Sequence, residues 1–112
     1  MKYNVFSIPP FDRQLKRLSK KYRSLKAEYA ALVEELEKNP IQGTELAGSC
    51  FKIRLAIASK GRGKSGGARV IIHVHVAKEN VFLLAIYDKG EKDSISDSEI
   101  SELLLEIDDI EI

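Results

Sequence analysis

The 112-residue sequence predicts an α+β fold, in which a small antiparallel sheet of about four strands packs against two N-terminal helices, followed by a short C-terminal helix. Three observations predict it: apolar residues at helical spacing between residues 11 and 38, strict apolar/polar alternation from residue 51, and a helix-capping sequence at residues 96–99. The hydrophobic content of 44% suits one core of ordinary size, so we expect a single domain spanning residues 1–112, with the helices on one face of the sheet.

The N-terminal third predicts a short strand followed by two helices. The strand ends where Pro9 and Pro10 set the start of a helix, a position at which the missing N–H of proline costs little. Ser24 is placed to cap a second helix that runs to about Lys38 and is closed by Asn39 and Pro40. One kinked helix would also fit the pattern, and we prefer two antiparallel helices.

Three further runs predict strands, each with one face turned towards the core. Between the first two runs, residues 59–68 combine four glycines with three cations, a composition typical of a hairpin loop. Residues that alternate with apolar positions are expected to leave the core side together, which puts Lys52, Arg54 and Arg69 on one face. In the first run the predicted inward residues are Phe51, Ile53, Leu55 and Ile57. In the second run they are Val70, Ile72, Val74 and Val76. In the third run Phe82, Leu84 and Ile86 are expected on one face, and Leu83, Ala85 and Tyr87 on the other.

The last element is predicted to be a helix that begins with a capping box. Ser96 can accept a hydrogen bond from the amide of Glu99, while the Glu99 side chain reaches back to the amide of Ser96. An apolar stripe then follows at helical spacing, formed by Ile100, Leu103, Leu104 and Ile107.

The charge distribution indicates a polyanion ligand. Basic residues outnumber acidic ones by 15 to 6 in residues 1–69, whereas acidic residues outnumber basic ones by 11 to 3 in residues 70–112. Such asymmetry is typical of a basic nucleic-acid-facing region beside an acidic tail, although a solvated charged surface is the alternative. Six cations gather between residues 51 and 72: Lys52, Arg54, Lys60, Arg62, Lys64 and Arg69.

Other classes of function find little support in the sequence. A lone Cys50 cannot form an internal disulfide and is interpreted as a small buried group. His73 and His75 share one strand face and could bind zinc or act in acid–base catalysis, but a third ligand is not evident, so we expect no metal and no cofactor. No apolar run reaches the ~20 residues of a membrane helix and the N-terminus lacks signal-peptide features, so a cytoplasmic protein is expected.

The strings CFKIRLA, GGARVI and LLAIYDKGEKDSIS resemble the RelE/ParE superfamily of toxins from type II toxin–antitoxin systems, closest to the RelE/HigB branch. The resemblance covers nearly the whole chain. It implies a ribosome-dependent mRNA endoribonuclease, or mRNA interferase, that cuts messenger RNA in the ribosomal A site. It further implies mRNA and the ribosome with its RNA as partners and a cognate antitoxin as inhibitor. The apolar pattern does not require a homodimer, so we expect the free toxin to be a monomer. A ParE-like poison of DNA gyrase and a non-catalytic RNA-binding domain are the alternatives.

The resemblance also implies site residues. RNA cleavage by a 2′-hydroxyl without a metal requires proton transfer and stabilisation of charge on phosphorus, which cationic side chains can provide. The implied catalytic residues are Lys52, Arg54 and Arg69, with Tyr87 replacing a tyrosine that lies further towards the C-terminus in the RelE pattern. The RNA-binding residues are expected to be Lys60, Arg62, Lys64 and Lys89, with Lys16 and Lys20 on the first helix as a ribosomal RNA surface.

Overall fold

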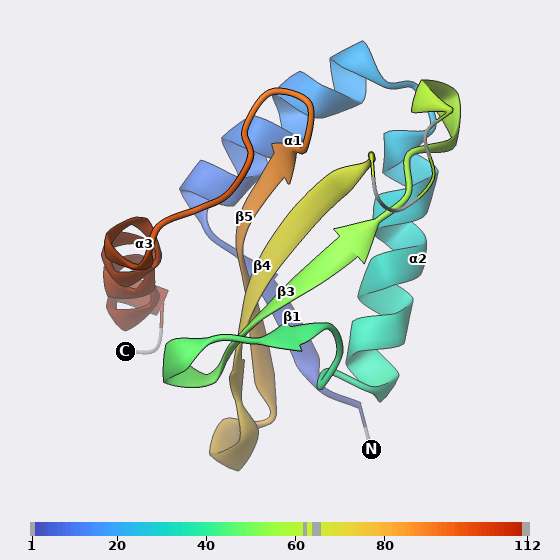
Figure 1. The fold of residues 1–112 in the computed structure, drawn as a ribbon. Helices are drawn as coiled ribbons and strands as arrows, with labels where there is room; N and C mark the ends of the chain where they lie inside the picture. The colour runs from blue at the N-terminus through green and yellow to red at the C-terminus, as the bar shows by residue number, and fades with distance from the viewer. Residues whose placement is uncertain (1, 62, 64–65, 111–112) are drawn as a thin grey trace.

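The computed structural model describes residues 2–61, 63 and 66–110, and it confirms the α+β class (Figure 1). Within these residues five strands form one sheet in the spatial order β1-β5-β4-β3-β2. The strand beyond the expected four is β2, whose two residues are too few to show alternation. Because β1 runs parallel to β5, the sheet is mixed and not purely antiparallel. The elements are β1 (Asn4–Ser7), α1 (Pro9–Lys21), α2 (Leu25–Lys38), β2 (Thr44–Glu45), β3 (Cys50–Leu55), β4 (Ala68–His75), β5 (Asn80–Asp88) and α3 (Asp97–Ile110).

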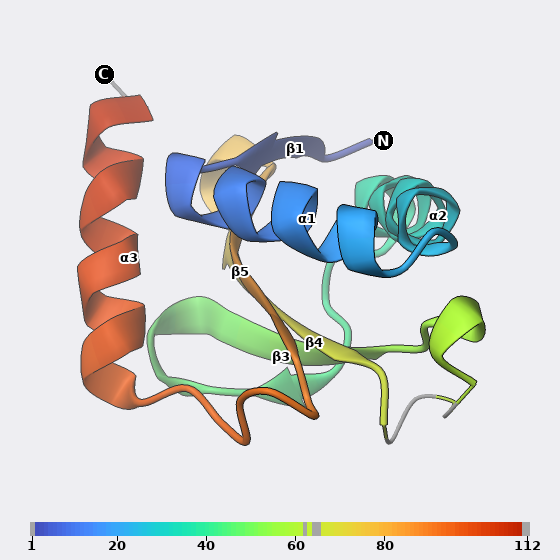
Figure 2. The same ribbon diagram turned by 90° about the horizontal axis from the view of Figure 1, so that it is seen from above.

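The two N-terminal helices are separate, as preferred from the sequence, and they lie together on one side of the sheet (Figure 2). Pro9 and Pro10 occupy the first turn of α1. Ser24 precedes α2 as expected, but its hydroxyl does not cap the helix. It bonds instead to Glu28 Oε1 at 3.0 Å and to Ser59 Oγ at 2.9 Å, so it connects α2 to the turn that follows β3.

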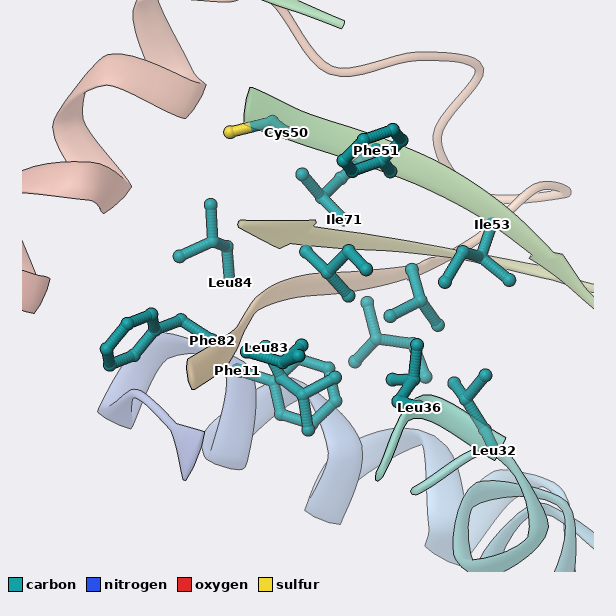
Figure 3. Close-up of a cluster of buried hydrophobic side chains, with 14 of the residues drawn as sticks. Phe11, Leu32, Leu36, Cys50, Phe51, Ile53, Ile71, Phe82, Leu83 and Leu84 are labelled. Carbon is teal, nitrogen blue, oxygen red and sulfur yellow. The ribbon is translucent and has the colours of Figure 1, made fainter. Parts of the chain in front are cut away.

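The main core lies between these helices and the sheet (Figure 3). Most of the predicted inward residues are buried, with two exceptions. Leu55, the last residue of β3, is partly buried. Val76 is 61% exposed because β4 ends at His75 and Val76 begins a 3₁₀ turn. The helices meet the sheet through fully or nearly fully buried side chains, among them Phe11, Leu18, Leu32, Leu36, Ile53, Val70, Ile72 and Leu83.

The prediction that Phe82, Leu84 and Ile86 share a face is wrong, because β5 contains a register shift. Leu83 pairs with Ile72, but Ala85 pairs with the adjacent Ile71, so Leu84 is an extra residue on β5. A bulge of this kind reverses the alternation of everything beyond it. Ile86 therefore faces the helices beside Val70, while Phe82 points to the other side, where it stacks with Phe6 at 5.5 Å between ring centroids.

Helix α3 is longer than expected and lies apart from the layer of α1 and α2 (Figure 2). Its predicted capping box is confirmed: the Glu99 amide donates to Ser96 Oγ at 3.2 Å, and the Ser96 amide donates to Glu99 Oε1 at 3.1 Å. Cys50 and Leu84 point towards α3, so the expectation that all helices cover one face is wrong (Figure 3). Across the described residues, no helix combines the length and apolar character needed to span a membrane.

Replacing Gly43 tests the packing of the turn that leads into β2. Gly43 has a φ of +83°, and an added Cβ would lie 2.2 Å from the carbonyl oxygen of Lys52. We expect Gly43→Ala to lower the free energy of unfolding by about 2 kcal/mol or more, because it adds a backbone clash to a strained conformation. Urea denaturation measures this. Gly61→Ala is the control, since its φ of +76° is similar but nothing lies within 4 Å. Equal losses in both variants would contradict the clash.

Candidate active site

Three predicted catalytic residues form one row across the central strands. Arg54 of β3 pairs with Arg69 of β4, and Arg69 pairs with Tyr87 of β5. Directly opposed residues on neighbouring strands project from the same face of a sheet. The structure therefore brings Arg54, Arg69 and Tyr87 together on the face turned away from α1 and α2, and we call them the central row.

Lys52 lies beside the central row. It precedes Arg54 by two residues on β3, so both project from the same face, and it pairs with Ile71 of β4. Lys52 is half-buried and Arg54 is exposed, whereas Arg69 and Tyr87 are each only 6% exposed. The site thus has two accessible cations next to a buried arginine and a buried tyrosine. Arg69 Nη1 donates to the carbonyl oxygen of Ala68 at 3.2 Å.

Burial controls the ionisation of Tyr87. It raises the pKa of the phenol above its ordinary value of 10.0, and the nearby charges of Arg69, Lys89 and Lys92 oppose that rise only partly. Tyr87 is therefore protonated at neutral pH. In chemical terms the phenol is a proton donor, and it is a poor base.

Lys92 is a cation near the site that the sequence reasoning missed. Its charge acts on Tyr87, and its Nζ pairs with Glu99 Oε2 at 2.5 Å. Both Lys92 and Tyr87 line a cavity of about 330 Å³ between α1, β5 and α3. The available signal was a second lysine three residues after Lys89 in the segment that follows Tyr87.

The predicted RNA-binding cations lie in different settings. Lys60 is 13% exposed in its side chain, with Nζ 2.5 Å from Asp88 Oδ1, and Lys89 Nζ is 2.7 Å from Asp93 Oδ1. Lys16 and Lys20 are exposed on α1 and border an open, wholly cationic depression. Arg62 and Lys64 lie outside the described residues. Of the four members that the structure describes, Lys60 and Lys89 line one depression, and Lys16 and Lys20 border another.

The other candidate groups do not form a recognisable catalytic or metal arrangement. His73 Nδ1 lies 2.9 Å from the carbonyl oxygen of Gly48, a geometry that favours a proton on that nitrogen. Burial raises the pKa of the Cys50 thiol to about 11, so the thiol is neutral. Among the described residues, no three histidine, cysteine, aspartate or glutamate side chains are grouped to hold a metal ion.

Asp88, the residue after Tyr87, is a buried charge on the opposite face of β5. It is 1% exposed and accepts hydrogen bonds from Lys60 Nζ, from the Tyr22 hydroxyl at 2.5 Å and from the Gly90 amide at 2.9 Å. Burial alone would raise the pKa of Asp88. The hydrogen bonds from Lys60, Tyr22 and Gly90 outweigh it and lower the pKa to about 2.

Comparison with known proteins identifies the family. A family described as the RelE toxin of the RelE/RelB toxin–antitoxin system matches residues 11–107. The chain therefore belongs to the RelE toxin family.

Solved structures share the fold. A mutant of the Escherichia coli RelE toxin in the free state is 20% identical, with 93% of this chain and 96% of that chain covered and a TM-score of 0.60. The intact E. coli RelBE toxin–antitoxin complex is 19% identical over 77% of this chain and 95% of that chain, with a TM-score of 0.57. The archaeal RelE–RelB complex from Pyrococcus horikoshii is 19% identical over 82% of this chain and 100% of that chain, with a TM-score of 0.56.

The Asp88 interactions predict a specific dependence of stability on pH. The folded pKa of about 2 lies below the ordinary 3.8, so Asp88 stabilises the fold fully above pH 4, and this contribution disappears as the pH falls towards 2. We expect the stability difference between wild type and Asp88→Asn to shrink by about 2 kcal/mol over that range. Urea denaturation at several pH values measures it. A difference that stays constant with pH would contradict the lowered pKa.

Proposed function

We propose that this RelE-family chain is a ribosome-dependent mRNA endoribonuclease that cuts messenger RNA in the A site by metal-independent attack of a ribose 2′-hydroxyl. The observation that carries the proposal is the central row, Arg54, Arg69 and Tyr87, with Lys52 beside it on the same face. Among the described residues neither Lys52 nor Arg54 forms an ion pair, so both cations are available to a phosphate.

The proposed reaction is a displacement at phosphorus. The 2′-oxygen bonds to the phosphorus as the bond to the 5′-oxygen of the next nucleotide breaks, which leaves a 2′,3′-cyclic phosphate and a 5′-hydroxyl. One proton must leave the 2′-hydroxyl, negative charge grows on the phosphate, and one proton must reach the leaving oxygen. Arg69 has the planar donor fork that fits the phosphate oxygens. Lys52 and Arg54 supply further charge stabilisation, and by stabilising the developing 2′-oxyanion they assist the loss of its proton to solvent water.

Tyr87 suits the last of these steps. Because burial keeps its phenol protonated, it donates a proton to the leaving 5′-oxygen more readily than it would accept one from the 2′-hydroxyl. Stacking on an unpaired base is the other role open to an aromatic residue at an RNA site, but its 6% exposure favours proton donation.

The remaining cations hold RNA backbone in this proposal. Lys89, Arg62, Lys64 and Lys60 lie on the segments that border the site in sequence. Lys16 and Lys20 face solvent on α1 and suit ribosomal RNA. Contacts of this kind position the substrate without reading its sequence.

A cognate antitoxin is the proposed inhibitor. Two of the matching structures are complexes of RelE with RelB, and the chain belongs to the family named for that system. Free toxin is proposed to be a monomer that acts in the cytoplasm, where ribosomes are.

A gyrase poison or a non-catalytic RNA-binding domain on this fold would leave messages uncut. Mapping message ends on stalled ribosomes, together with plasmid supercoiling, separates these three activities.

Removing the charge of Lys52 tests the site with little risk to folding, because the side chain is half-exposed. We expect Lys52→Gln to lower the rate of A-site cleavage about 100-fold, since one cation that stabilises the transition state is lost. Primer extension on stalled ribosomes measures cleavage, and thermal unfolding checks the fold. Lys38→Gln, an exposed cation at the end of α2, is the control and should cleave normally. Full activity in Lys52→Gln would contradict the assignment.

Removing only the hydroxyl of Tyr87 tests proton donation. We expect Tyr87→Phe to lower kcat roughly 100-fold with little change in KM, because the ring remains while the donor is lost. Single-turnover cleavage on programmed ribosomes gives both constants. Tyr29→Phe is the matched control, because Tyr29 is a partly buried tyrosine on α2 that contacts Phe11. A raised KM with unchanged kcat would show that Tyr87 binds RNA and does not transfer a proton.

A further inference from the structure

The side chains of the consecutive residues Tyr87 and Asp88 lie on opposite faces of β5. Tyr87 pairs with Arg69 in the central row, whereas Asp88 pairs with Ala68 and turns towards α1. The backbone that carries the central row is thus the same backbone that carries the buried carboxylate. Any shift of Asp88 moves Tyr87 and, through the β4 pairing, Arg69.

Three segments distant in sequence converge on this carboxylate. Lys60 comes from the 3₁₀ turn Ala58–Lys60 that follows β3, Tyr22 from the end of α1, and Gly90 from the loop that follows β5. Lys21 Nζ adds a longer ion pair at 3.6 Å. Because Asp88 is 1% exposed, these groups and not water satisfy its oxygens.

The 3₁₀ turn is also held from its other side. The Ala58 amide donates to Glu28 Oε2 at 2.7 Å, and the Ser59 amide donates to Ser24 Oγ at 2.9 Å. Both acceptors lie at the start of α2. The turn is therefore clamped between α2 and Asp88, directly after the strand that carries Lys52 and Arg54.

The space around the ion pair is closely fitted. A Cβ added at Gly90 would lie 3.2 Å from Lys60 Nζ and 3.4 Å from Asp88 Oδ1. The Lys89 amide donates to the carbonyl oxygen of Gly67 at 3.0 Å, which continues the β4–β5 pairing past Asp88. The ends of β4 and β5 and the turn after β3 thus meet at one carboxylate.

We propose that Asp88 and Lys60 form a positioning pair that aligns the central row, with Lys60 acting as an anchor and not as an RNA ligand. The inference rests on the proposed nuclease function and revises one of its residues. For Lys60 to reach a phosphate it would have to leave Asp88, and the buried carboxylate would then keep only the longer ion pair with Lys21 and the hydrogen bonds from Tyr22 and Gly90. Removing the closest cation from a buried carboxylate is unfavourable. A lysine used in this way contributes to cleavage only through Arg69 and Tyr87.

A double-mutant cycle tests the positioning pair. Asp88→Asn and Lys60→Gln should each lower kcat on programmed ribosomes about tenfold, and the double variant should lose no more than either single variant. KM should change less than about twofold, because Lys52 and Arg54 remain. Glu91→Gln is the matched control, since it changes net charge as Asp88→Asn does and removes another carboxylate bound by Lys21, yet should cleave normally. Additive losses in the double variant would overturn the proposal.

Binding to a single-stranded RNA oligonucleotide provides a second discriminating measurement. Each phosphate contact by a cation contributes about 0.7 to the slope of log affinity against log salt concentration. Lys60→Gln should leave this slope unchanged, whereas Lys52→Gln should reduce it. A reduced slope in Lys60→Gln would show that Lys60 binds RNA directly, which overturns the anchor.

Hydrogen exchange tests the anchor without any activity. The amides of Lys60 and Gly61 should exchange at least about tenfold faster in Asp88→Asn than in Glu91→Gln. Gly90→Ala, which keeps both charges and only crowds the pair, should accelerate them to a smaller degree if Asp88→Asn does not fold. Unchanged exchange in a folded variant would refute the anchor. Accelerated exchange in a protein that cuts no message would support it while the nuclease function failed.

Discussion

The register shift at Leu84 is the constraint on which the site depends. On the first half of β5, the odd-numbered residues Val81 and Leu83 face α1 and α2. Without the extra residue the same alternation would carry Tyr87 into the helix-facing core and turn Asp88 outwards. The bulge reverses the faces of the residues beyond it. Tyr87 therefore lies on the same face as Arg54 and Arg69, and the Asp88 carboxylate contacts Lys60 and Tyr22 on the other face.

The central row is unfavourable as an isolated arrangement. Arg54 and Arg69 are directly opposed on neighbouring strands, and like charges at opposed positions destabilise a sheet. A phosphate placed between the two guanidinium groups would turn that repulsion into attraction for both. The apolar core on the other face of the sheet and the ion pair of Asp88 stabilise the strands that carry this row. The central row thus lies on one face of the sheet, and the apolar core and the Asp88 ion pair lie on the other.

The sequence predicted what depends on local pattern and missed what depends on contacts between distant segments. Alternation placed Phe51, Ile53, Lys52 and Arg54 on their correct faces, and the capping box at residues 96–99 was found because its two partners are three residues apart. The bulge has no comparable signature, since Leu84 is one apolar residue within an apolar run. The Lys60–Asp88 pair spans 28 residues, which no spacing rule covers.

The same limit explains why counting cations located the site only approximately. The sequence showed a basic first part and an acidic second part, and the fold brings the two together. Carboxylates of the second part pair with three cations of the first: Glu91 with Arg17 and Lys21, and Asp88 with Lys60. Within the second part, Asp93 pairs with Lys89 and Glu99 with Lys92. In the described part of the chain, Lys52 and Arg54 are left out of these pairs. The surface that we propose for a polyanion is thus defined less by where cations are dense in the sequence than by where the carboxylates of the acidic half do not reach. Strand β3 beside Arg69 and Tyr87 is one such place, and the exposed face of α1 with Lys16 and Lys20 is another.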